Sequence, residues 1–331
     1  MTGTAPQRRR LIVSGADAPF FGLLRGLLSS LRRLGRHGGA DLGVLDGGLR
    51  PEQRAWLEAQ GVLVRPAEWG FDFPLLRRVE RECPSLKVLL SRPRLPTIFP
   101  GYDSILWLDA DLWVQRADAV ALFFRVAERG RLAAVLEFDR SYAELWAGRP
   151  YWDRVRNANT AVAGREVAAA LECRPTINAG ALALPADAPH WEQWRTLTED
   201  NFRRLARYDW PVFLVDQLAL NRAVHVEGLP FRPLPTWCNW LCHMALPAWD
   251  PGTQTLRDPF PPGDLIGLVH VSDRTKHAPV RLPGTDGIWR TMWLTWPPRP
   301  HPGPQPLTDS GATEPGPTES RAEPLPGPEA S

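Results

Sequence analysis

The stretch YDSILWLDADLWVQ, residues Tyr102 to Gln115, decides how this sequence folds. Its residues Ser104 to Leu108 form a short apolar run, which is typical of a strand buried on both faces of a sheet. The run ends in Asp109 and Asp111, and residues i and i+2 of an extended backbone point the same way. The sequence therefore predicts two carboxylates that address one ligand beyond the carboxyl end of a buried strand.

A divalent cation fits this pair of carboxylates. Mg²⁺ and Mn²⁺ take oxygen ligands, and beside a nucleotide they share one or two protein carboxylates with the phosphates of the substrate. The apolar residues on both sides of the pair, Leu106 to Leu108 and Leu112 to Val114, place it at the edge of a core. The alternative interpretation of an isolated Asp-x-Asp is a surface turn or a capping pair.

The N-terminal third reads as alternating strands and helices. This order favours an α/β fold with a mainly parallel sheet and helices on both faces. Ligands of such sheets bind beyond the carboxyl ends of the strands, which is where Asp17, Asp46 and Asp109 fall. The predicted elements are strands at Leu11 to Val13, Asp41 to Leu45 and Val62 to Arg65, and helices at Phe21 to Leu34 and Pro51 to Ala59.

Further elements follow on both sides of the acidic strand. From Pro297 onward the character changes, because eleven of the 35 prolines lie there and no apolar periodicity remains. We expect one domain over residues 8–296 and a disordered, proline-rich tail over 297–331. The further predicted elements are helices at Leu86 to Leu95, Asp118 to Arg125, His190 to Leu205 and Asp216 to Ala223, and strands at Leu132 to Leu136, Thr176 to Leu184 and Leu265 to Val271.

Composition argues against several classes of protein. The 39 basic and 37 acidic residues are interspersed and leave a net charge of +2, so nucleic-acid binding is unsupported. No stretch approaches the roughly 20 apolar residues of a membrane span, and Arg8 to Arg10 are only a weak basis for peripheral contact with anionic lipid. The four cysteines are too few and too scattered for a disulfide framework. We therefore expect a cytoplasmic enzyme, acting in solution or at the inner face of a membrane.

Four motifs in order resemble those of glycosyltransferase family 8. This family comprises retaining nucleotide-sugar transferases of GT-A fold, among them glycogenin and lipopolysaccharide galactosyltransferases. The resemblance covers roughly Leu11 to His277 and implies a GT-A fold, a metal ion and a sugar nucleotide. The motifs are YDSILWLDADLWV, TINAGALAL at Thr176 to Leu184, DQLALN at Asp216 to Asn221 and HVSDRTK at His270 to Lys276.

The resemblance implies a role for each motif residue. His270 would complete a metal site with Asp109 and Asp111, and an imidazole among oxygen ligands favours Mn²⁺ over Mg²⁺. Lys276 would meet the diphosphate as a mobile point charge. The remaining implied residues are Asp17, Asp46, Arg92 and Lys87 for the sugar nucleotide, and Asp216, Gln217 and Asn178 for catalysis.

The expected reaction is transfer of a sugar from a nucleoside diphosphate donor, UDP-linked, to a hydroxyl of a glycan or other acceptor. It would retain the anomeric configuration, as a hexosyltransferase of lipopolysaccharide or other glycan biosynthesis. Two mechanisms stay open. A double displacement would use Asp216 or Gln217 as the nucleophile, whereas in a front-face reaction Gln217 and Asn178 position the sugar. Trp237 and Trp240 are the predicted wall of the acceptor site.

The chain departs from the family pattern at several positions. Pro19 replaces a polar residue, Asp273 replaces a glycine, and His277 with Ala278 replaces a proline-tryptophan pair. These departures keep open a non-catalytic module that binds a sugar nucleotide or a glycan. A haloacid dehalogenase-like phosphatase also has a strand-end Asp-x-Asp, but it expects threonine or valine where this chain has Trp113.

Overall fold

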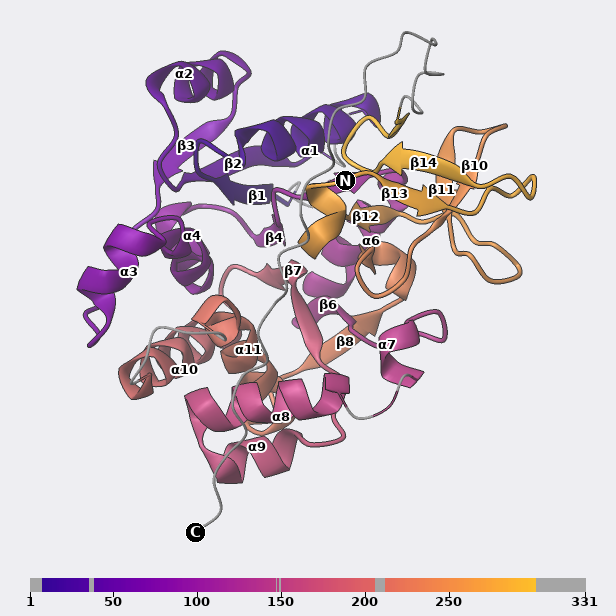
Figure 1. The fold of residues 1–331 in the computed structure, drawn as a ribbon. Coiled ribbons are helices and arrows are strands. Elements are labelled where there is room, and N and C mark those ends of the chain that lie inside the picture. The colour runs from indigo at the N-terminus through magenta and orange to yellow at the C-terminus, as the bar shows by residue number, and fades with distance from the viewer. Residues whose placement is uncertain (1–7, 36–38, 147, 149, 206–211, 302–331) are drawn as a thin grey trace, which may run out of the picture. The chain divides into compact units, whose positions relative to one another are not determined.

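The computed structural model describes residues 8–35, 39–146, 148, 150–205 and 212–301, so the predicted tail from residue 302 lies outside the described residues. Its central element is a seven-stranded sheet with the order β3-β2-β1-β4-β7-β6-β8 (Figure 1). The strand predicted at Ser104 to Leu108 is β4, at the middle of this order. The strands of the sheet are β1 (Arg10–Ala16), β2 (Asp41–Asp46), β3 (Leu63–Pro66), β4 (Ser104–Leu108), β6 (Leu132–Leu136), β7 (Ile177–Pro185) and β8 (Phe231–Leu234).

Among the strands described in this sheet, only β7 runs against the rest. It pairs antiparallel with β4 and β6, whereas the other neighbours pair in parallel. Because β7 is reversed, its first residues lie at the edge where β4 and β6 end, with Asn178 opposite Val135 and Ala181 opposite Leu108. The predicted fold class, a mainly parallel mixed sheet in an α/β fold, is confirmed.

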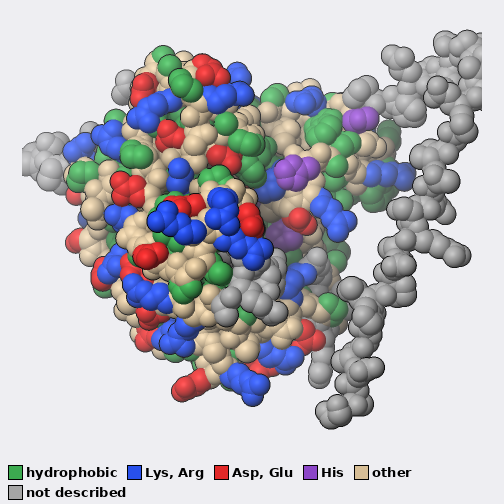
Figure 2. Space-filling model, turned by 60° about the vertical axis from the view of Figure 1, so that its left-hand side comes forward, with side chains coloured by type: hydrophobic (Ala, Val, Ile, Leu, Met, Phe, Trp, Pro, Cys, Tyr) green, Lys and Arg blue, Asp and Glu red, His purple; other side chains and the backbone are tan. Residues whose placement is uncertain are grey.

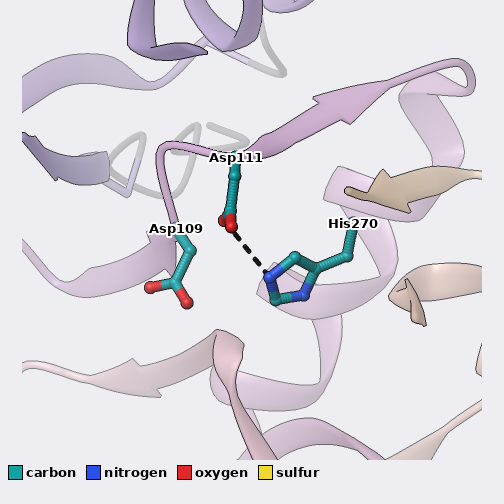
Figure 3. A group of neighbouring side chains, drawn as sticks. All are labelled: Asp109, Asp111 and His270. Carbon is teal, nitrogen blue, oxygen red and sulfur yellow. Dashed lines mark ion pairs between the residues drawn. The ribbon is translucent and has the colours of Figure 1, made fainter. Parts of the chain in front are cut away.

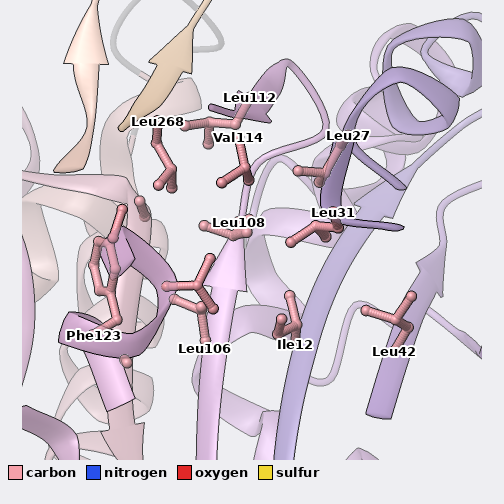
Figure 4. Close-up of a cluster of buried hydrophobic side chains, with 14 of the residues drawn as sticks. Ile12, Leu27, Leu31, Leu42, Leu106, Leu108, Leu112, Val114, Phe123 and Leu268 are labelled. Atoms are coloured by element: carbon pink, nitrogen blue, oxygen red, sulfur yellow. The ribbon is translucent and has the colours of Figure 1, made fainter. Parts of the chain in front are cut away.

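Alternate residues of the strands enter two different cores. Ile12 and Leu106 point to the core that is covered by α1, α2 and α6 (Figure 4). Leu11 and Ile105 point to the opposite core, which is covered by α4, α5, α10 and α11. A continuous apolar run is what a strand with two covered faces requires. The covering helices are α1 (Phe21–Arg33), α2 (Pro51–Ala59), α6 (Ala117–Ala127), α4 (Leu86–Ser91), α5 (Leu95–Ile98), α10 (His190–Arg204) and α11 (Val215–His225).

A second, three-stranded sheet returns the chain to the acidic stretch. It is formed by β5 (Leu112–Val114), β12 (Leu268–His270) and β9 (Trp240–Leu241). β12 pairs antiparallel with β5, which places His270 opposite Leu112. The strand predicted at Leu265 to Val271 is thus present, but it is shorter than predicted and is followed by three more strands.

The compact unit ends at His301 and not at the predicted residue 296. The last strand pairs antiparallel with β14, and the His301 amide donates to the Thr291 carbonyl over 2.8 Å. Prolines are tolerated in edge strands, so a proline-rich composition alone misplaced the boundary. The remaining elements are α3 (Leu76–Glu82), η2 (Arg92–Arg94), α7 (Ala143–Trp146), α8 (Pro150–Ala163), α9 (Arg165–Leu171), η3 (Val212–Leu214), η4 (Thr236–Cys238), β10 (Ala248–Asp250), β11 (Thr255–Arg257), η5 (Asp273–Lys276), β13 (Val280–Leu282), β14 (Arg290–Trp293) and β15 (Arg299–Pro300).

The surface agrees with the predicted balance of charge. Figure 2 shows basic and acidic side chains interspersed over one face of the molecule.

All four cysteines are free thiols. In the part of the chain that the structure describes, no helix combines the length and the apolar character needed to cross a membrane.

Candidate active site

A tight turn between β4 and β5 carries Asp109 and Asp111. The Leu112 amide donates to the Asp109 carbonyl over 3.1 Å and closes the turn. Both carboxylates face His270 at the end of β12 (Figure 3). The extended backbone that was predicted for the two aspartates is wrong, because a turn brings their side chains together and not the pleat of a strand.

These three side chains can hold a divalent cation. His270 Nε2 lies 3.2 Å from Asp111 Oδ1, and one ligand atom of each residue lies within 4.8 Å of the others. Gly180 makes this approach possible, because a Cβ there would lie 2.5 Å from His270 Cε1 and 2.9 Å from Asp109 Oδ2. Two carboxylates and one imidazole suit Mn²⁺, so the residues present fit the predicted metal.

Cations offset the charge of the two carboxylates. Arg92 Nη1 lies 3.4 Å from Asp109 Oδ1, and Lys276 Nζ lies 2.7 Å from Asp111 Oδ2. Burial opposes charge on Asp111, but His270 and Lys276 outweigh it and hold the pKa of that carboxyl well below its usual range. Burial raises the pKa of Asp109, against the opposing effect of Arg92. These contacts favour the ionised form of Asp111, which is the form that can bind a cation.

Arg92 is a buried cation that joins two acidic residues. Its guanidinium pairs with Asp109 and with Asp216, and it lies 5.6 Å and 6.0 Å from the ring centres of Trp107 and Trp194. Burial raises the pKa of Asp216, and Arg92 opposes this. Asp216 is only 2% exposed, so the structure places it behind the site as the counter-ion of Arg92.

Two cavities meet at Asp109 and Lys276. The first has a volume of about 410 Å³ and is lined mainly by apolar residues around the carboxyl end of β1, together with Asp17. The second has a volume of about 660 Å³ and is more polar. Its lining includes the predicted residues Arg92, Asn178, Gln217 and Lys276. Asp109, one of the three residues that could hold a cation, thus lies where an apolar and a polar compartment join.

Some predicted residues lie elsewhere. The Asp46 carboxylate accepts hydrogen bonds from the amides of Gly48 and Leu49 over 2.9 and 2.7 Å, and it pairs with Arg54. Asp46 is therefore the turn residue that precedes α2. As far as the described residues define the two cavities, neither Asp46 nor Lys87 lines them.

The predicted tryptophan wall is wrong. Trp240 is 1% exposed and belongs to a hydrophobic core. Trp237 packs against the core beside α6, with the Arg116 guanidinium 4.3 Å from its ring centre. Trp240 thus lies in a core and the half-buried Trp237 packs against one, and neither is among the described residues that line the two cavities.

Two further residues of the site, Glu137 and Asn239, were not among those predicted. Glu137 follows β6 and accepts hydrogen bonds from Asn178 Nδ2 over 2.9 Å and from Gln217 Nε2 over 3.0 Å. It lines the second cavity. The strand-end rule that singled out Asp109 would also have found Glu137. Asn239 lies between η4 and β9, in a stretch that carried no periodicity or motif.

Asp273, where the resemblance expects a glycine, has a backbone conformation that favours glycine. Its φ of 53° lies in the left-handed region, which aspartate tolerates better than most residues. Asp273 also lines the second cavity. Asp273 therefore places a carboxylate in the loop of Lys276, at a left-handed backbone position.

Comparison with known proteins gives structural matches alone. No family model and no curated protein matches the chain. Galactosyltransferase LgtC, solved with donor and acceptor sugar analogs, is similar at 15% identity over 78% of this chain and 86% of that chain, with a TM-score of 0.47. Mouse xyloside xylosyltransferase 1 is similar at 15% identity over 80% and 96%, with a TM-score of 0.44. Glycosyltransferase GlyE of Streptococcus pneumoniae TIGR4 is similar at 19% identity over 71% and 47%, with a TM-score of 0.41.

Proposed function

We propose that this protein is a metal-dependent glycosyltransferase. It moves a sugar from a nucleoside diphosphate donor, UDP-linked, to a hydroxyl of a glycan or other acceptor. The observation that carries the proposal is the group of Asp109, Asp111 and His270, because its Asp109 lines both the apolar and the polar cavity. A base and ribose suit the first cavity, a sugar and its acceptor suit the second, and the diphosphate then spans the junction.

The junction is suited to a departing diphosphate. Asp109, Asp111 and His270 would hold Mn²⁺ or Mg²⁺, which when bound supplies a Lewis acid for the phosphate oxygens. Lys276 lines both cavities, so its ammonium can pair with the same oxygens. Positive charge placed where negative charge develops in the transition state is commonly the largest single contribution that a protein makes to such a step.

The hydrogen bonds of the second cavity favour a front-face reaction with retention. Gln217 Oε1 accepts from the Ala179 amide over 2.9 Å and its Nε2 donates to Glu137, so its amide positions groups and is a poor nucleophile. Asp216 is paired with Arg92 and buried. Glu137 is a carboxylate on the cavity wall, where it can accept a hydrogen bond from the attacking hydroxyl and orient it.

Calorimetric titration of UDP into the full chain with Mn²⁺ tests the nucleotide site. Binding should disappear with a chelator and in Asp109→Asn, and it should persist in Asp118→Asn, a matched change in an exposed ion pair with Arg116. Release of UDP from a panel of UDP-sugars then tests turnover. Binding without release from any sugar nucleotide would support the non-catalytic module, and hydrolysis of simple phosphate esters would support a phosphatase.

A further inference from the structure

We propose that Asn239 is a positioning residue of the metal centre. Together with Asn178 and Gly180 it forms a relay of hydrogen bonds that holds His270 with Nε2 toward the two aspartates. The relay deepens the proposed function, because it concerns the metal site on which that function rests. Its members come from the start of β7, the link between η4 and β9, and the end of β12.

The relay begins at a group whose role is fixed. The Gly180 backbone amide can only donate, and it donates to Asn178 Oδ1 over 2.9 Å. This sets the orientation of the Asn178 amide, so that Nδ2 donates to Glu137 Oε1 over 2.9 Å. A backbone donor at one end and a carboxylate acceptor at the other require the same orientation of Asn178.

Asn239 passes this orientation on to the histidine. Asn178 Oδ1 can only accept, so the Asn239 group 2.8 Å from it is the donor Nδ2. Asn239 Oδ1 then faces His270 Nδ1 at 3.0 Å. Because an amide oxygen only accepts, Nδ1 carries a proton whenever this contact is made. Nε2 is left as the nitrogen whose lone pair can reach a cation.

Burial makes the relay rigid. The side chains of Asn239 and Asn178 are 0% and 7% exposed, so water does not readily take their places. Gly180 contributes a second time, because a Cβ there would lie 2.9 Å from Asn178 Oδ1 and 2.5 Å from His270 Cε1. Partners of the free ring nitrogen of a metal-bound histidine fix its tautomer and orientation, and Asn239 is placed to do this for His270.

Titration of the full chain with Mn²⁺ alone, followed by the spin-resonance signal of free Mn²⁺, tests the relay. Asn239→Leu removes the acceptor and should raise the dissociation constant about 10- to 100-fold. Asn239→Asp keeps an acceptor oxygen for Nδ1 and should bind at least about tenfold more tightly than Asn239→Leu. Asn159→Leu is the control, because Asn159 is a buried amide of α8 that bonds within its own helix, and it should bind like the wild type.

Equal losses in Asn239→Leu and Asn239→Asp would overturn the proposal, as would unchanged affinity in Asn239→Leu. Thermal unfolding checks that each variant folds. If a variant does not fold, the wild type can be measured instead. Side-chain ¹⁵N spectra of the Zn²⁺-loaded wild type should show the His270 proton on Nδ1 and the metal on Nε2. A proton on Nε2, or no binding of Mn²⁺ or Zn²⁺, would overturn the relay. Neither measurement uses a nucleotide or a sugar, so loss of sugar transfer alone would count only against the proposed function.

Discussion

Gly180→Ala should disable the proposed metal site through steric contact alone. The new Cβ would lie 2.5 Å from His270 Cε1, 2.9 Å from Asn178 Oδ1 and 2.9 Å from Asp109 Oδ2. Ordinary contact begins at 3.4 Å, so His270 must retreat by about 0.9 Å and each oxygen by about 0.5 Å, the differences between 3.4 Å and those distances. Metal–ligand distances tolerate only about 0.2 Å. The required shifts exceed this tolerance severalfold.

The expected result is a weaker metal site in a protein that still folds. Mn²⁺ affinity should fall at least about tenfold, which is about 1.4 kcal/mol. Overpacking of this kind lowers the free energy of unfolding by about 1–3 kcal/mol. Gly22→Ala is the matched control, because nothing lies within 4 Å of its added Cβ. Gly22 lies in the first turn of α1, so alanine there should stabilise the fold by less than the roughly 1 kcal/mol that it gains in a helix interior.

Mn²⁺ titration and denaturant unfolding of both variants measure these effects. If Gly180→Ala binds Mn²⁺ as tightly as the wild type, then His270 and Asp109 are free to move aside without cost. The inference that the site is closely packed around Gly180 would then be refuted.

Three further predictions concern charge and burial. Asp273→Gly and Asp273→Asn should both tighten binding of UDP with Mn²⁺ in calorimetry, because each removes a negative charge from the loop of Lys276; weaker binding in both would contradict this. Arg92→Met should cost about 3–5 kcal/mol of unfolding free energy, because it leaves Asp216 buried without its partner, and a double variant with Asp216→Leu should regain part of that loss in denaturant unfolding. Burial lowers the pKa of His190, whose Nε2 donates to the Pro230 carbonyl over 2.9 Å. The unfolded state therefore takes up a proton on His190 more readily than the folded state does. The contribution of His190 to the free energy of unfolding is complete above the unfolded pKa of about 6.5, and below it the free energy of unfolding falls by up to about 1.4 kcal/mol per pH unit. In urea unfolding above and below this pH, the free energy of unfolding should depend less on pH in His190→Gln than in the wild type. An identical pH dependence in the two proteins would contradict this role of His190.

Much of the scaffold was predictable because its signals are local. The continuous apolar run of Ser104 to Leu108, buried along its whole length, and the helical spacing of Phe21 to Leu34 record which faces each segment buries, wherever its partners lie. The helix at Pro51–Ala59 and the strands at Ser104–Leu108 and Leu132–Leu136 have the predicted bounds. The group of Asp109, Asp111 and His270 was predicted from the motifs, and the structure brings these side chains together.

What the sequence determined by itself is the composition of the site: two aspartates at the end of a buried strand, a histidine and a lysine. The tertiary structure decided which groups face them. The reversal of β7 brings Gly180 and Asn178 to the metal group, and a turn before α2 takes Asp46 away from it. Glu137 and Asn239 both belong to the site because each forms a hydrogen bond with Asn178, which lies far from them along the chain. Hydrophobic periodicity is set by neighbours in sequence, whereas a polar side chain's partners are set by strand order and register, which no local pattern encodes.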